Sequence, residues 1–412
     1  MKLAKHKKKI IGILGVGYVG LPLAICLANK YSVKSFDASK ERIDELKVGF
    51  DKNEEFKKKE IIQKNLFYTS SINDLSICNY FIIAVPTPIK KNFKPDLQYL
   101  KKANILVSKI IKKNDIIIYE STVYPGLTDE YCIPQIEKYS GLISNKDFYY
   151  GYSPERVNPG DKLKTISNIV KITSGSNKAT SQKIDKLYKS VITAGTFNTT
   201  SIKVAESAKV IENIQRDINI ALVNELSMIF AKMHIDGNEV IKAAATKWNF
   251  NKFTPGLVGG HCIGVDPYYL AYKSKQVGVN PKIILAGRHI NNNYFKYLAK
   301  KIEKNKGKSV LIMGISFKEN CKDLRNTQVV KIYEHLKKRK YKVDIYDPIV
   351  DKDEAKKIYN IRLVNKITKN KYDSVLIAVA HKTFFKQKKT IQSALKKNGK
   401  IVDLKNIFKK LL

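Results

Sequence analysis

The stretch "IIGILGVGYVG", residues 10–20, joins a short apolar run to three glycines spaced as GxGxxG. The apolar run predicts a buried β-strand, and "LPLAICLANK" (21–30) predicts a helix that tolerates Pro22 in its first turn. A strand, a glycine turn and a helix in this order are typical of a dinucleotide site, because the helix N-terminus attracts phosphate groups. The alternative is a glycine turn in a fold that binds no nucleotide.

Each glycine has its own task in such a site. Gly15 makes the tight turn, Gly17 lets the backbone approach the pyrophosphate, and Gly20 lets the helix pack on the strand. The predicted phosphate loop therefore comprises Gly15, Val16, Gly17, Tyr18, Val19 and Gly20.

Asp37 lies 22 residues after Gly15, at the end of a second predicted strand, "VKSF" (33–36). Its carboxylate can bond a ribose 2′-hydroxyl and would repel a 2′-phosphate, so the predicted cofactor is NAD and not NADP. The nearby cations of Lys40 and Arg42 soften that preference.

Further apolar strands alternate with amphipathic helices up to about residue 195. They lie in "YFIIAVPTP" (80–88) and "DIIIYESTVYPG" (115–126), and the alternation predicts a parallel sheet with helices on both faces. A long helix is predicted over residues 201–233. A second α/β unit begins near residue 308, with strands in "KSVLIMGISF", "KVDIYDP" and "SVLIAVA".

The predicted fold class is α/β, with two Rossmann-like, doubly wound parallel-sheet domains joined by a central helical region that contains one long helix. The predicted domains are an NAD-binding domain (1–200), a central helical domain (201–303) and a C-terminal Rossmann-like domain (304–412).

Composition limits the class of protein. Of the 412 residues, 43% are hydrophobic, and no apolar run reaches the roughly 18 residues that a membrane span needs. The N-terminus is basic and then apolar, like a signal peptide, but it runs into the glycine motif without a cleavage site, so a strand is predicted. Five scattered cysteines without CxxC spacing indicate a reduced, cytoplasmic protein with no disulfide framework and no metal site.

The formal net charge of +39 would favour nucleic acid, an acidic membrane or an anionic substrate. The lysines are spread along the whole chain, and no basic block is interleaved with aromatic residues. We therefore predict a solvated, lysine-rich surface, no nucleic-acid partner and no membrane insertion.

The long helix carries a polar stripe. Glu206, Lys209, Asn213 and Arg216 are three or four residues apart and share one face. Lysine and asparagine one turn apart can hold an alcohol or a developing oxyanion, so the stripe predicts a cleft or a subunit boundary. The alternative is a solvent-facing stripe. The apolar periodicity around it consists of Ile202, Ala205, Ala208, Ile211, Ile214, Ile218, Leu222, Ile229 and Met233.

A second unusual stretch is "GLVGGHCIGVDPYYL", residues 256–270. Cys262 lies on a glycine loop, before a predicted helix in which Asp266 is the N-cap and Pro267 the first residue. A helix start favours a thiolate, which makes Cys262 a candidate nucleophile. A buried core cysteine and a metal ligand are the alternatives, and adjacent His261 invites a Cys–His pair, although neighbours in sequence need not face each other.

A cysteine combined with an NAD motif indicates a particular chemistry. Oxidation of an alcohol gives an aldehyde, and a thiolate can add to the aldehyde to form a thiohemiacetal. A second oxidation gives a thioester, which water hydrolyses to a carboxylate. One protein could thus take an alcohol to an acid with two NAD.

The chain resembles the nucleotide-sugar 6-dehydrogenases, the UDP-glucose/GDP-mannose dehydrogenase family, over almost its whole length. The motifs that carry the resemblance occur in the family's order: "GVGYVGLPLA", "AVPTP", "ESTVYPG", "YSPERVNPGD", "AKVIENIQRDINIALVNE", "GLVGGHCIGVDPYYL" and "GISFKENCKDLRNT". "KWNF" (247–250) before the glycine loop is similar to the branch that acts on UDP-N-acetylhexosamines, UDP-GlcNAc or UDP-GalNAc. That branch makes uronic acids for capsules and O-antigens.

The resemblance implies roles for matching positions. The catalytic residues would be Cys262 as nucleophile, Lys209 as acid/base group with Asn213 beside it, Asp266 supporting the thiol, Glu155 at the thioester stage and Thr122 positioning water. NAD would contact the phosphate loop, Asp37, Arg42, Pro86, Thr87, Ser121, Thr122 and Arg325. The UDP-sugar would contact Glu155, Arg156, Lys209, Asn213, Phe253, Pro255, Gly256, Leu257, Gly259, Phe317 and Lys318, with residues 304–412 as the UDP-sugar-binding domain. Two departures from the family pattern, Leu127 and Lys322, touch no catalytic position.

Several alternatives stay open. Glu155 could form a structural salt bridge with Arg156, and Lys318 and Arg325 could be surface charges. UDP-glucose or UDP-N-acetylmannosamine could be the substrate. Two other classes are a two-electron hydroxyacid dehydrogenase, which would not need Cys262, and a non-enzymatic polyanion-binding protein. The long helix predicts a homodimer.

Overall fold

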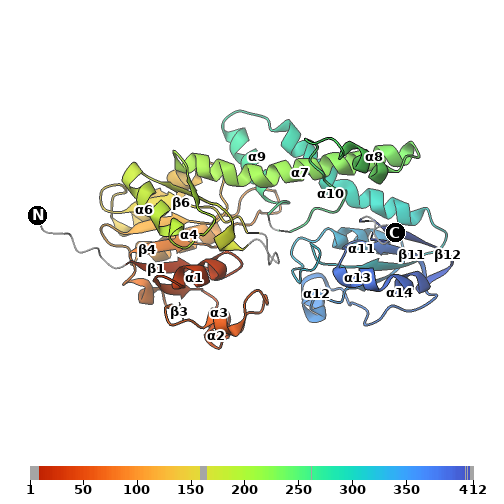
Figure 1. The fold of residues 1–412 in the computed structure, drawn as a ribbon, viewed down its shortest axis with the longest axis horizontal. Helices are drawn as coiled ribbons and strands as arrows, with labels where there is room; N and C mark the ends of the chain where they lie inside the picture. The colour runs from red at the N-terminus through yellow and green to blue at the C-terminus, as the bar shows by residue number, and fades with distance from the viewer. Residues whose placement is uncertain (1–8, 158–164, 261, 404, 406, 409–412) are drawn as a thin grey trace, which may run out of the picture. The chain divides into compact units, whose positions relative to one another are not determined.

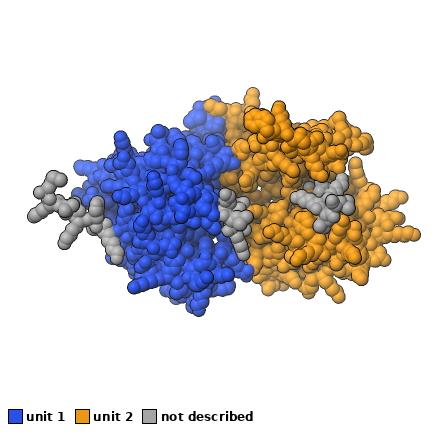
Figure 2. All heavy atoms as spheres, in the orientation of Figure 1, with its two compact units in different colours: residues 1–212, 268–278 blue, residues 213–267, 279–412 orange. Residues whose placement is uncertain are grey.

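The computed structural model describes residues 9–157, 165–260, 262–403, 405 and 407–408. The chain divides into two compact units, residues 1–212 with 268–278 and residues 213–267 with 279–412 (Figure 2). Each unit is built around its own sheet (Figure 1).

The first unit contains an eight-stranded sheet in the order β3-β2-β1-β4-β5-β6-β7-β8. The pairs from β3 to β6 are parallel, β6 and β7 pair antiparallel, and β7 and β8 are parallel to each other. The strands are β1 (Ile10–Leu14), β2 (Ser32–Phe36), β3 (Leu66–Thr69), β4 (Tyr80–Ile83), β5 (Ile116–Tyr119), β6 (Tyr149–Tyr152), β7 (Lys171–Gly175) and β8 (Thr196–Asn198). The predicted parallel sheet is confirmed, except that β7 and β8 run in the opposite direction to the other strands.

The helices of this unit connect and cover the strands. They are α1 (Gly20–Ala28), α2 (Lys40–Lys47), α3 (Lys58–Ile61), α4 (Gln98–Ser108), α5 (Ile133–Ser140), α6 (Lys178–Lys189) and α9 (Asp266–Gln276), with the short turns η1 (Ile72–Leu75), η2 (Thr128–Cys132) and η3 (Ile166–Asn168). All nine residues of α1 are buried, as expected for a helix that is apolar on every side. Strands β4 and β5 are buried along their whole length, which is typical of a parallel sheet covered on both faces.

The strand order reverses at β1, since β2 lies on one side of it and β4 on the other. In open α/β sheets, ligands bind beyond the carboxyl ends of the strands at such a point. All the predicted cofactor residues of this unit, that is all except Arg325, follow β1, β2, β4 or β5, and Glu155 follows β6. The topology therefore gathers them at one edge of the sheet.

The long helix α7 runs from Ile202 to Lys232, close to the predicted range. Its apolar residues do not all enter the core. Ile202, Ala205 and Ile214 are buried, whereas four others are about half exposed: Ile211 (53%), Leu222 (52%), Ile229 (46%) and Met233 (57%). The periodicity correctly predicted the helix, but it does not show which of these apolar residues are buried.

The second unit contains a four-stranded parallel sheet in the order β10-β9-β11-β12. Its strands are β9 (Ser309–Met313), β10 (Lys342–Tyr346), β11 (Tyr372–Ile377) and β12 (Leu395–Asp403). Its helices are α8 (Gly237–Ala244), α10 (Lys282–Glu303), α11 (Val329–Lys338), α12 (Lys352–Tyr359), α13 (Lys382–Lys386) and α14 (Lys388–Ser393). Val310 and Ile312 of β9 enter one buried cluster and Leu311 and Met313 another, so the sheet is covered on both faces.

The α/β fold class with two parallel-sheet regions and a helical central region is thus confirmed. Within the described ranges, every helix is too short or too polar to span a bilayer.

Candidate active site

The phosphate loop has the geometry that a dinucleotide needs. Gly15 has φ +94°, and a Cβ there would lie 2.8 Å from the Ala84 carbonyl oxygen. A Cβ at Gly20 would lie 1.8 Å from the Gly15 oxygen, so both positions require glycine. A Cβ at Gly17 would meet no atom within 4 Å, which leaves its backbone open to an approaching phosphate. The intervening Val16, Tyr18 and Val19 connect the turn to α1.

Asp37 follows β2 and supports this loop. Its Oδ2 accepts a hydrogen bond from the Val16 N–H over 3.0 Å, and its Oδ1 accepts one from the Ser39 N–H over 2.9 Å. The side chain is only partly buried, and a carboxylate has further lone pairs for a ribose hydroxyl. The loop and Asp37 together therefore fit NAD.

Arg42 was expected to be a cation available to the cofactor, but it is paired with two carboxylates. It is buried, and its Nη2 lies 2.8 Å from Asp51 Oδ1, while Nη1 lies 3.3 Å from Glu45 Oε2. Its Nε donates to the Val16 carbonyl over 3.3 Å. These bonds make Arg42 a support of the phosphate loop; its predicted contact with NAD stays a prediction.

The other predicted cofactor positions of this unit lie where β4 and β5 end. Pro86 is exposed, and the Thr87 carbonyl accepts a hydrogen bond from the Tyr269 hydroxyl over 2.9 Å. Ser121 is buried and donates to the Val85 carbonyl over 2.6 Å, which ties the end of β5 to the segment after β4. Thr122 is partly exposed beside it.

Glu155 lies just beyond β6 and is buried. Its Oε1 accepts the backbone N–H groups of Arg156 and Val157, and its buried Oε2 has no hydrogen-bond partner among the described residues. Arg156 does not pair with it: the guanidinium lies 2.8 Å from Glu212 Oε1 and also donates to the Val170 carbonyl. An oxygen without a partner in this position suits a group that exchanges protons.

The polar stripe of α7 is buried in its first half. Glu206 is fully buried and its two oxygens accept the N–H groups of Gly126 (2.5 Å) and Thr128 (3.0 Å). Burial raises the pKa of Glu206 to about 7, although these hydrogen bonds act in the opposite direction. Lys209 is 7% exposed, Asn213 is partly buried and Arg216 is exposed. A solvent-facing stripe is thus ruled out for Glu206 and Lys209.

Cys262 lies in the turn that leads into α9. Its carbonyl accepts the N–H groups of Val265 (2.9 Å) and Asp266 (2.8 Å), so the helical hydrogen bonds begin at the cysteine. The helix starts at Asp266 itself, one residue earlier than expected, and Asp266 Oδ2 accepts a hydrogen bond from the Asn213 amide over 2.6 Å. His261 lies outside the described residues.

Cys262 is partly exposed, whereas the other four cysteines are buried. Burial raises the pKa of Cys26 to about 11 and that of Cys78 to about 12, and it raises the pKa of Cys132 further. These thiols are therefore poor nucleophiles. The contrast favours the nucleophile interpretation of Cys262 over the core interpretation.

The glycine loop before Cys262 is fixed by its neighbours within the second unit. Asn224 accepts from the Gly256 N–H (2.8 Å) and donates to the Gly256 carbonyl (3.0 Å). A Cβ at Gly259 would lie 2.8 Å from the Asn326 carbonyl oxygen, and one at Gly260 would lie 2.7 Å from the Phe317 ring. Phe317 thus packs directly on the loop, as expected of residues that enclose one ligand.

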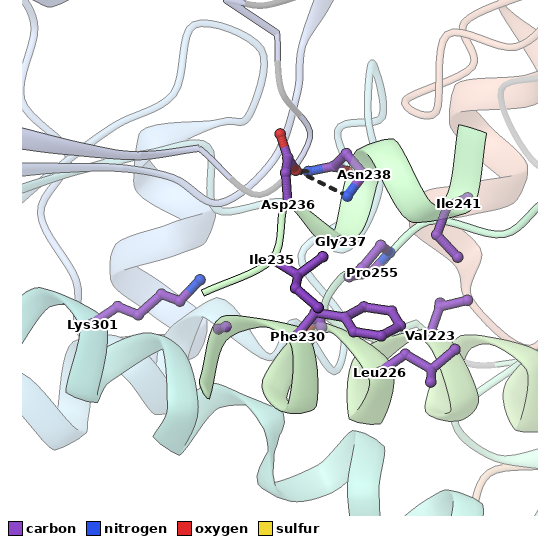
Figure 3. A pocket seen from close by; sticks show the side chains of 12 residues that line it. Val223, Leu226, Phe230, Ile235, Asp236, Gly237, Asn238, Ile241, Pro255 and Lys301 are labelled. Carbon is purple, nitrogen blue, oxygen red and sulfur yellow. Dashed lines mark hydrogen bonds between the residues drawn. The ribbon is translucent and has the colours of Figure 1, made fainter. Parts of the chain in front are cut away.

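The rest of the predicted sugar-binding loop is more open. Phe253, Pro255 and Leu257 are partly exposed. Pro255 also lines a hollow of about 180 Å³ between the end of α7 and α8, with Phe230, Ile235 and Lys301 (Figure 3).

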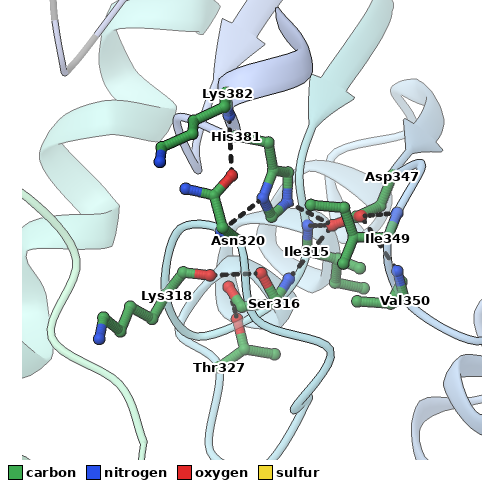
Figure 4. A network of polar contacts seen from close by, with 10 residues as sticks. All are labelled: Ile315, Ser316, Lys318, Asn320, Thr327, Asp347, Ile349, Val350, His381 and Lys382. Atoms are coloured by element: carbon green, nitrogen blue, oxygen red, sulfur yellow. Dashed lines mark hydrogen bonds and ion pairs between the residues drawn. The ribbon is translucent and has the colours of Figure 1, made fainter. Parts of the chain in front are cut away.

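Lys318 extends away from a buried polar network that holds its loop (Figure 4). In this network Asp347 Oδ2 lies 3.0 Å from His381 Nε2, both side chains being fully buried, and Asp347 also accepts the Ile315 N–H over 2.8 Å. His381 Nδ1 accepts the Asn320 N–H over 3.0 Å. Arg325 is exposed and paired with Asp323, 2.5 Å from Oδ2, so its predicted contact with NAD stays a prediction.

Sequence patterns missed two buried polar groups near these positions. One joins Glu120, Lys171 and Tyr188. The other joins Arg288 to Asp217 (2.6 Å), and Asp217 through Asn291 (2.7 Å) to Asn224. The only signal in the sequence was an isolated lysine or arginine within an apolar strand or helix. The partners could not be predicted because they are distant in sequence: Glu120 lies 51 residues before Lys171.

Comparison with known families agrees with this arrangement. Three family models of the UDP-glucose/GDP-mannose dehydrogenases match in order: the NAD binding domain over residues 9–192, the central domain over 203–293 and the UDP binding domain over 311–410. The chain belongs to the UDP-glucose/GDP-mannose dehydrogenase family. It is therefore an NAD-dependent nucleotide-sugar dehydrogenase.

Individual relatives match more than nine tenths of the chain. Protein CapL of Staphylococcus aureus is 50% identical over 406 residues, covering 97% of this chain and 96% of the relative. The UDP-N-acetyl-D-glucosamine 6-dehydrogenase of Salmonella typhi is 50% identical over 383 residues, covering 91% and 90%. The solved structure of a UDP-D-ManNAc dehydrogenase from Pyrococcus horikoshii is 30% identical with a TM-score of 0.86, covering 97% of this chain and 96% of the other.

Proposed function

We propose that this dehydrogenase oxidises the C6 hydroxyl of a UDP-N-acetylhexosamine, UDP-GlcNAc or UDP-GalNAc, to the uronic acid in a four-electron reaction with two NAD. The observation that carries the proposal is the partly exposed Cys262 in the turn before α9, in a chain whose other cysteines are buried. The 50% identity to a UDP-N-acetyl-D-glucosamine 6-dehydrogenase supports the sugar. UDP-glucose and UDP-N-acetylmannosamine are the alternative substrates.

The first oxidation turns the alcohol into an aldehyde. NAD, when bound, takes up the hydride in each of the two oxidations. Lys209 accepts the hydroxyl proton and then donates a hydrogen bond to the carbonyl oxygen, together with the Asn213 amide. Because Lys209 is almost fully buried, its interaction with a developing negative charge is weakly screened.

The second oxidation uses the thiolate. Cys262 Sγ bonds to the aldehyde carbon, and the resulting thiohemiacetal oxygen is held by the same donors. Loss of the second hydride equivalent converts the thiohemiacetal into a thioester on Cys262. The start of α9 and the hydrogen-bonded Asp266 hold the cysteine in place for this step.

Hydrolysis completes the reaction. Thr122 positions a water molecule and Glu155 takes its proton through the oxygen that has no other partner among the described residues. The water oxygen bonds to the thioester carbon, the C–S bond breaks, and the thiolate of Cys262 is restored with release of the uronate.

The proposal assigns one task to each of the three predicted domains. Residues 1–200 bind NAD, residues 201–303 supply the catalytic helix and the cysteine loop, and residues 304–412 bind the UDP moiety with Phe317 and Lys318. The enzyme acts as a cytoplasmic homodimer without a nucleic-acid partner or membrane insertion. Its product serves capsule or O-antigen synthesis, as the resemblance implies.

The test is the stoichiometry of NADH with four substrates: UDP-GlcNAc, UDP-GalNAc, UDP-N-acetylmannosamine and UDP-glucose. Two NADH per sugar are expected with an N-acetylhexosamine, whereas a hydroxyacid dehydrogenase would give one NADH with its own substrate and a polyanion-binding protein none. The variant Cys262→Ser should lose uronate formation but still reduce the UDP-aldehyde sugar with NADH. Uronate formation at the normal rate by Cys262→Ser would refute the thioester route.

A further inference from the structure

A buried ion pair lies where β5, β6 and β7 meet. Lys171, the first residue of β7, places Nζ 2.5 Å from Glu120 Oε2, and the Tyr188 hydroxyl donates to Glu120 Oε1 over 2.5 Å. Lys171 is 3% exposed, and Glu120 and Tyr188 are fully buried. The mechanism above uses none of the three.

The lysine has a second acceptor. Its Nζ donates to the Pro154 carbonyl over 2.9 Å, and Pro154 precedes Glu155. The Oε1 of Glu155 accepts the N–H groups of Arg156 and Val157, so the direction of its carboxylate depends on the path of this backbone. Lys171 therefore fixes the backbone segment that orients the Glu155 carboxylate.

The glutamate connects the same lysine to the segment of Thr122. Glu120 follows β5 directly, and its N–H donates to the Ile83 carbonyl over 2.9 Å. Because β5 and β6 are parallel neighbours, the segments of Thr122 and Glu155 leave the sheet at the same edge. The ion pair bridges these two segments.

Stability alone does not explain such a pair. Removing two charges from water is costly, and apolar residues of similar volume often serve a fold equally well. Burial raises the pKa of Glu120 to about 7, while Lys171 acts in the opposite direction. A buried pair of ionisable side chains that also bonds the backbone next to a proposed proton-transfer group points to a functional role.

We infer that the Lys171–Glu120 pair is a positioning device for Glu155, fixing the Pro154 carbonyl and thereby the direction of the Glu155 carboxylate for thioester hydrolysis. The inference rests on the proposed function, in which Glu155 serves that step. Lys171 and Glu120 act through the backbone and do not touch the substrate.

The experiment compares Lys171→Met with Glu155→Gln as reference and Lys186→Met, an exposed lysine of α6, as control. Each protein is mixed rapidly with NAD and the UDP-sugar that the unmodified enzyme oxidises, and NADH and the intact protein mass are followed. In Lys171→Met we expect two NADH per active site at nearly the normal rate. The steady-state rate should then fall by about ten- to a hundredfold, and a uronyl adduct on Cys262 should accumulate.

A second variant separates an effect on hydrolysis from an effect on folding. Lys171→Met with Glu120→Gln leaves no unpaired buried charge, so it should fold and still accumulate the adduct. If both oxidations slow equally, in proportion to the folded fraction, the pair is merely structural and the inference is overturned. If the adduct accumulates in Glu155→Gln but in neither Lys171 variant, the inference is overturned while the proposed role of Glu155 stands. No adduct in Glu155→Gln overturns the proposed role of Glu155 and the inference with it.

Discussion

The Asn213 side-chain amide donates a hydrogen bond to Asp266 Oδ2 over 2.6 Å, linking the middle of α7 to the start of α9. Asp266 N–H in turn donates to the Cys262 carbonyl over 2.8 Å. One residue, Asp266, thus connects the helix that carries the proposed oxyanion donor, through its carboxylate, to the turn that carries the proposed nucleophile, through its N–H.

Exchanging the two partners tests this link. Asn213→Asp alone places two carboxylates together, and Asp266→Asn alone replaces the charged acceptor with a weaker neutral amide oxygen, so each should lower kcat/KM and slow the alkylation of Cys262. The double variant, Asn213→Asp with Asp266→Asn, restores one amide–carboxylate bond and should recover about 0.5–3 kcal/mol as a coupling energy. Additive losses in kcat/KM would mean that the bond does not matter for the reaction.

Asp37 should set the choice of cofactor. Asp37→Ala removes a charged acceptor for the ribose hydroxyl and the repulsion of a 2′-phosphate, so KM for NAD should rise by about ten- to a hundredfold while NADP becomes usable. Asp44 is exposed, and Asp44→Ala is the matched control. It should change neither KM for NAD nor the discrimination against NADP. Equal turnover with NADP in the unmodified enzyme would contradict this role.

Local patterns predicted the start of the first unit well because its signals all lie within residues 10–37. The apolar strand, the three glycines and Asp37 each depend on a neighbour close in sequence, and the structure has them where the pattern indicates. The extended segments 80–88 and 115–126 were too long as strands. β4 ends at Ile83, before the prolines that lack an N–H for the ladder, and β5 ends at Tyr119.

Features that depend on distant partners escaped prediction. Lys171 looked like one more surface lysine, yet β7 runs antiparallel to β6 and brings it to Glu120. Arg42 looked like a free cation beside the cofactor, but Asp51 and Glu45 pair with it. The apolar spacing of α7 could not separate residues that face the core from residues that stay exposed, because both repeat with the same period.

Lys209 should act on chemistry more than on binding. Lys209→Ala should lower kcat by about 100- to 1000-fold with a small change in KM for the UDP-sugar, because its charge matters most when an oxyanion develops. Lys232→Ala, on the exposed end of the same helix, serves as control. An unchanged kcat would remove Lys209 from the active site.

The exposed apolar residues of α7 should form the homodimer contact. At about 100° per residue, Ile211, Leu222 and Ile229 point within about 20° of one another, so they form one stripe. Leu222→Glu with Ile229→Glu should convert the dimer to a monomer, measured by light scattering after size exclusion. Arg216→Glu, on the opposite side of α7, should leave the dimer intact. A monomeric unmodified protein, or a dimer that survives the double change, would rule out this contact.

The buried Asp347 should make the C-terminal sheet sensitive to acid. Burial opposes its ionisation, but hydrogen bonds from His381 and from the N–H groups of Ile315 and Ile349 prevail, so the pKa of Asp347 lies below its usual value. A carboxyl group with a lowered native pKa contributes stability above the unfolded pKa, about 3.9 for Asp, and loses that contribution as the pH falls through the native pKa.

Asp347→Asn should therefore destabilise β9 and β10 by about 1–3 kcal/mol at pH 7, because His381 and the N–H groups of Ile315 and Ile349 lose their charged acceptor. The difference from the unmodified protein should start to shrink as the pH falls through the unfolded pKa of Asp, about 3.9, and should be lost once the pH has fallen through the lower native pKa of Asp347. Hydrogen exchange of the β9 and β10 amides in the whole protein, at pH 7 and at lower pH after correction for the intrinsic rate, measures both effects. The exposed Asp353→Asn is the control with little expected change. An Asp347→Asn deficit that stayed constant down to acid pH would show that the lost contribution comes from packing and not from the ionised carboxylate.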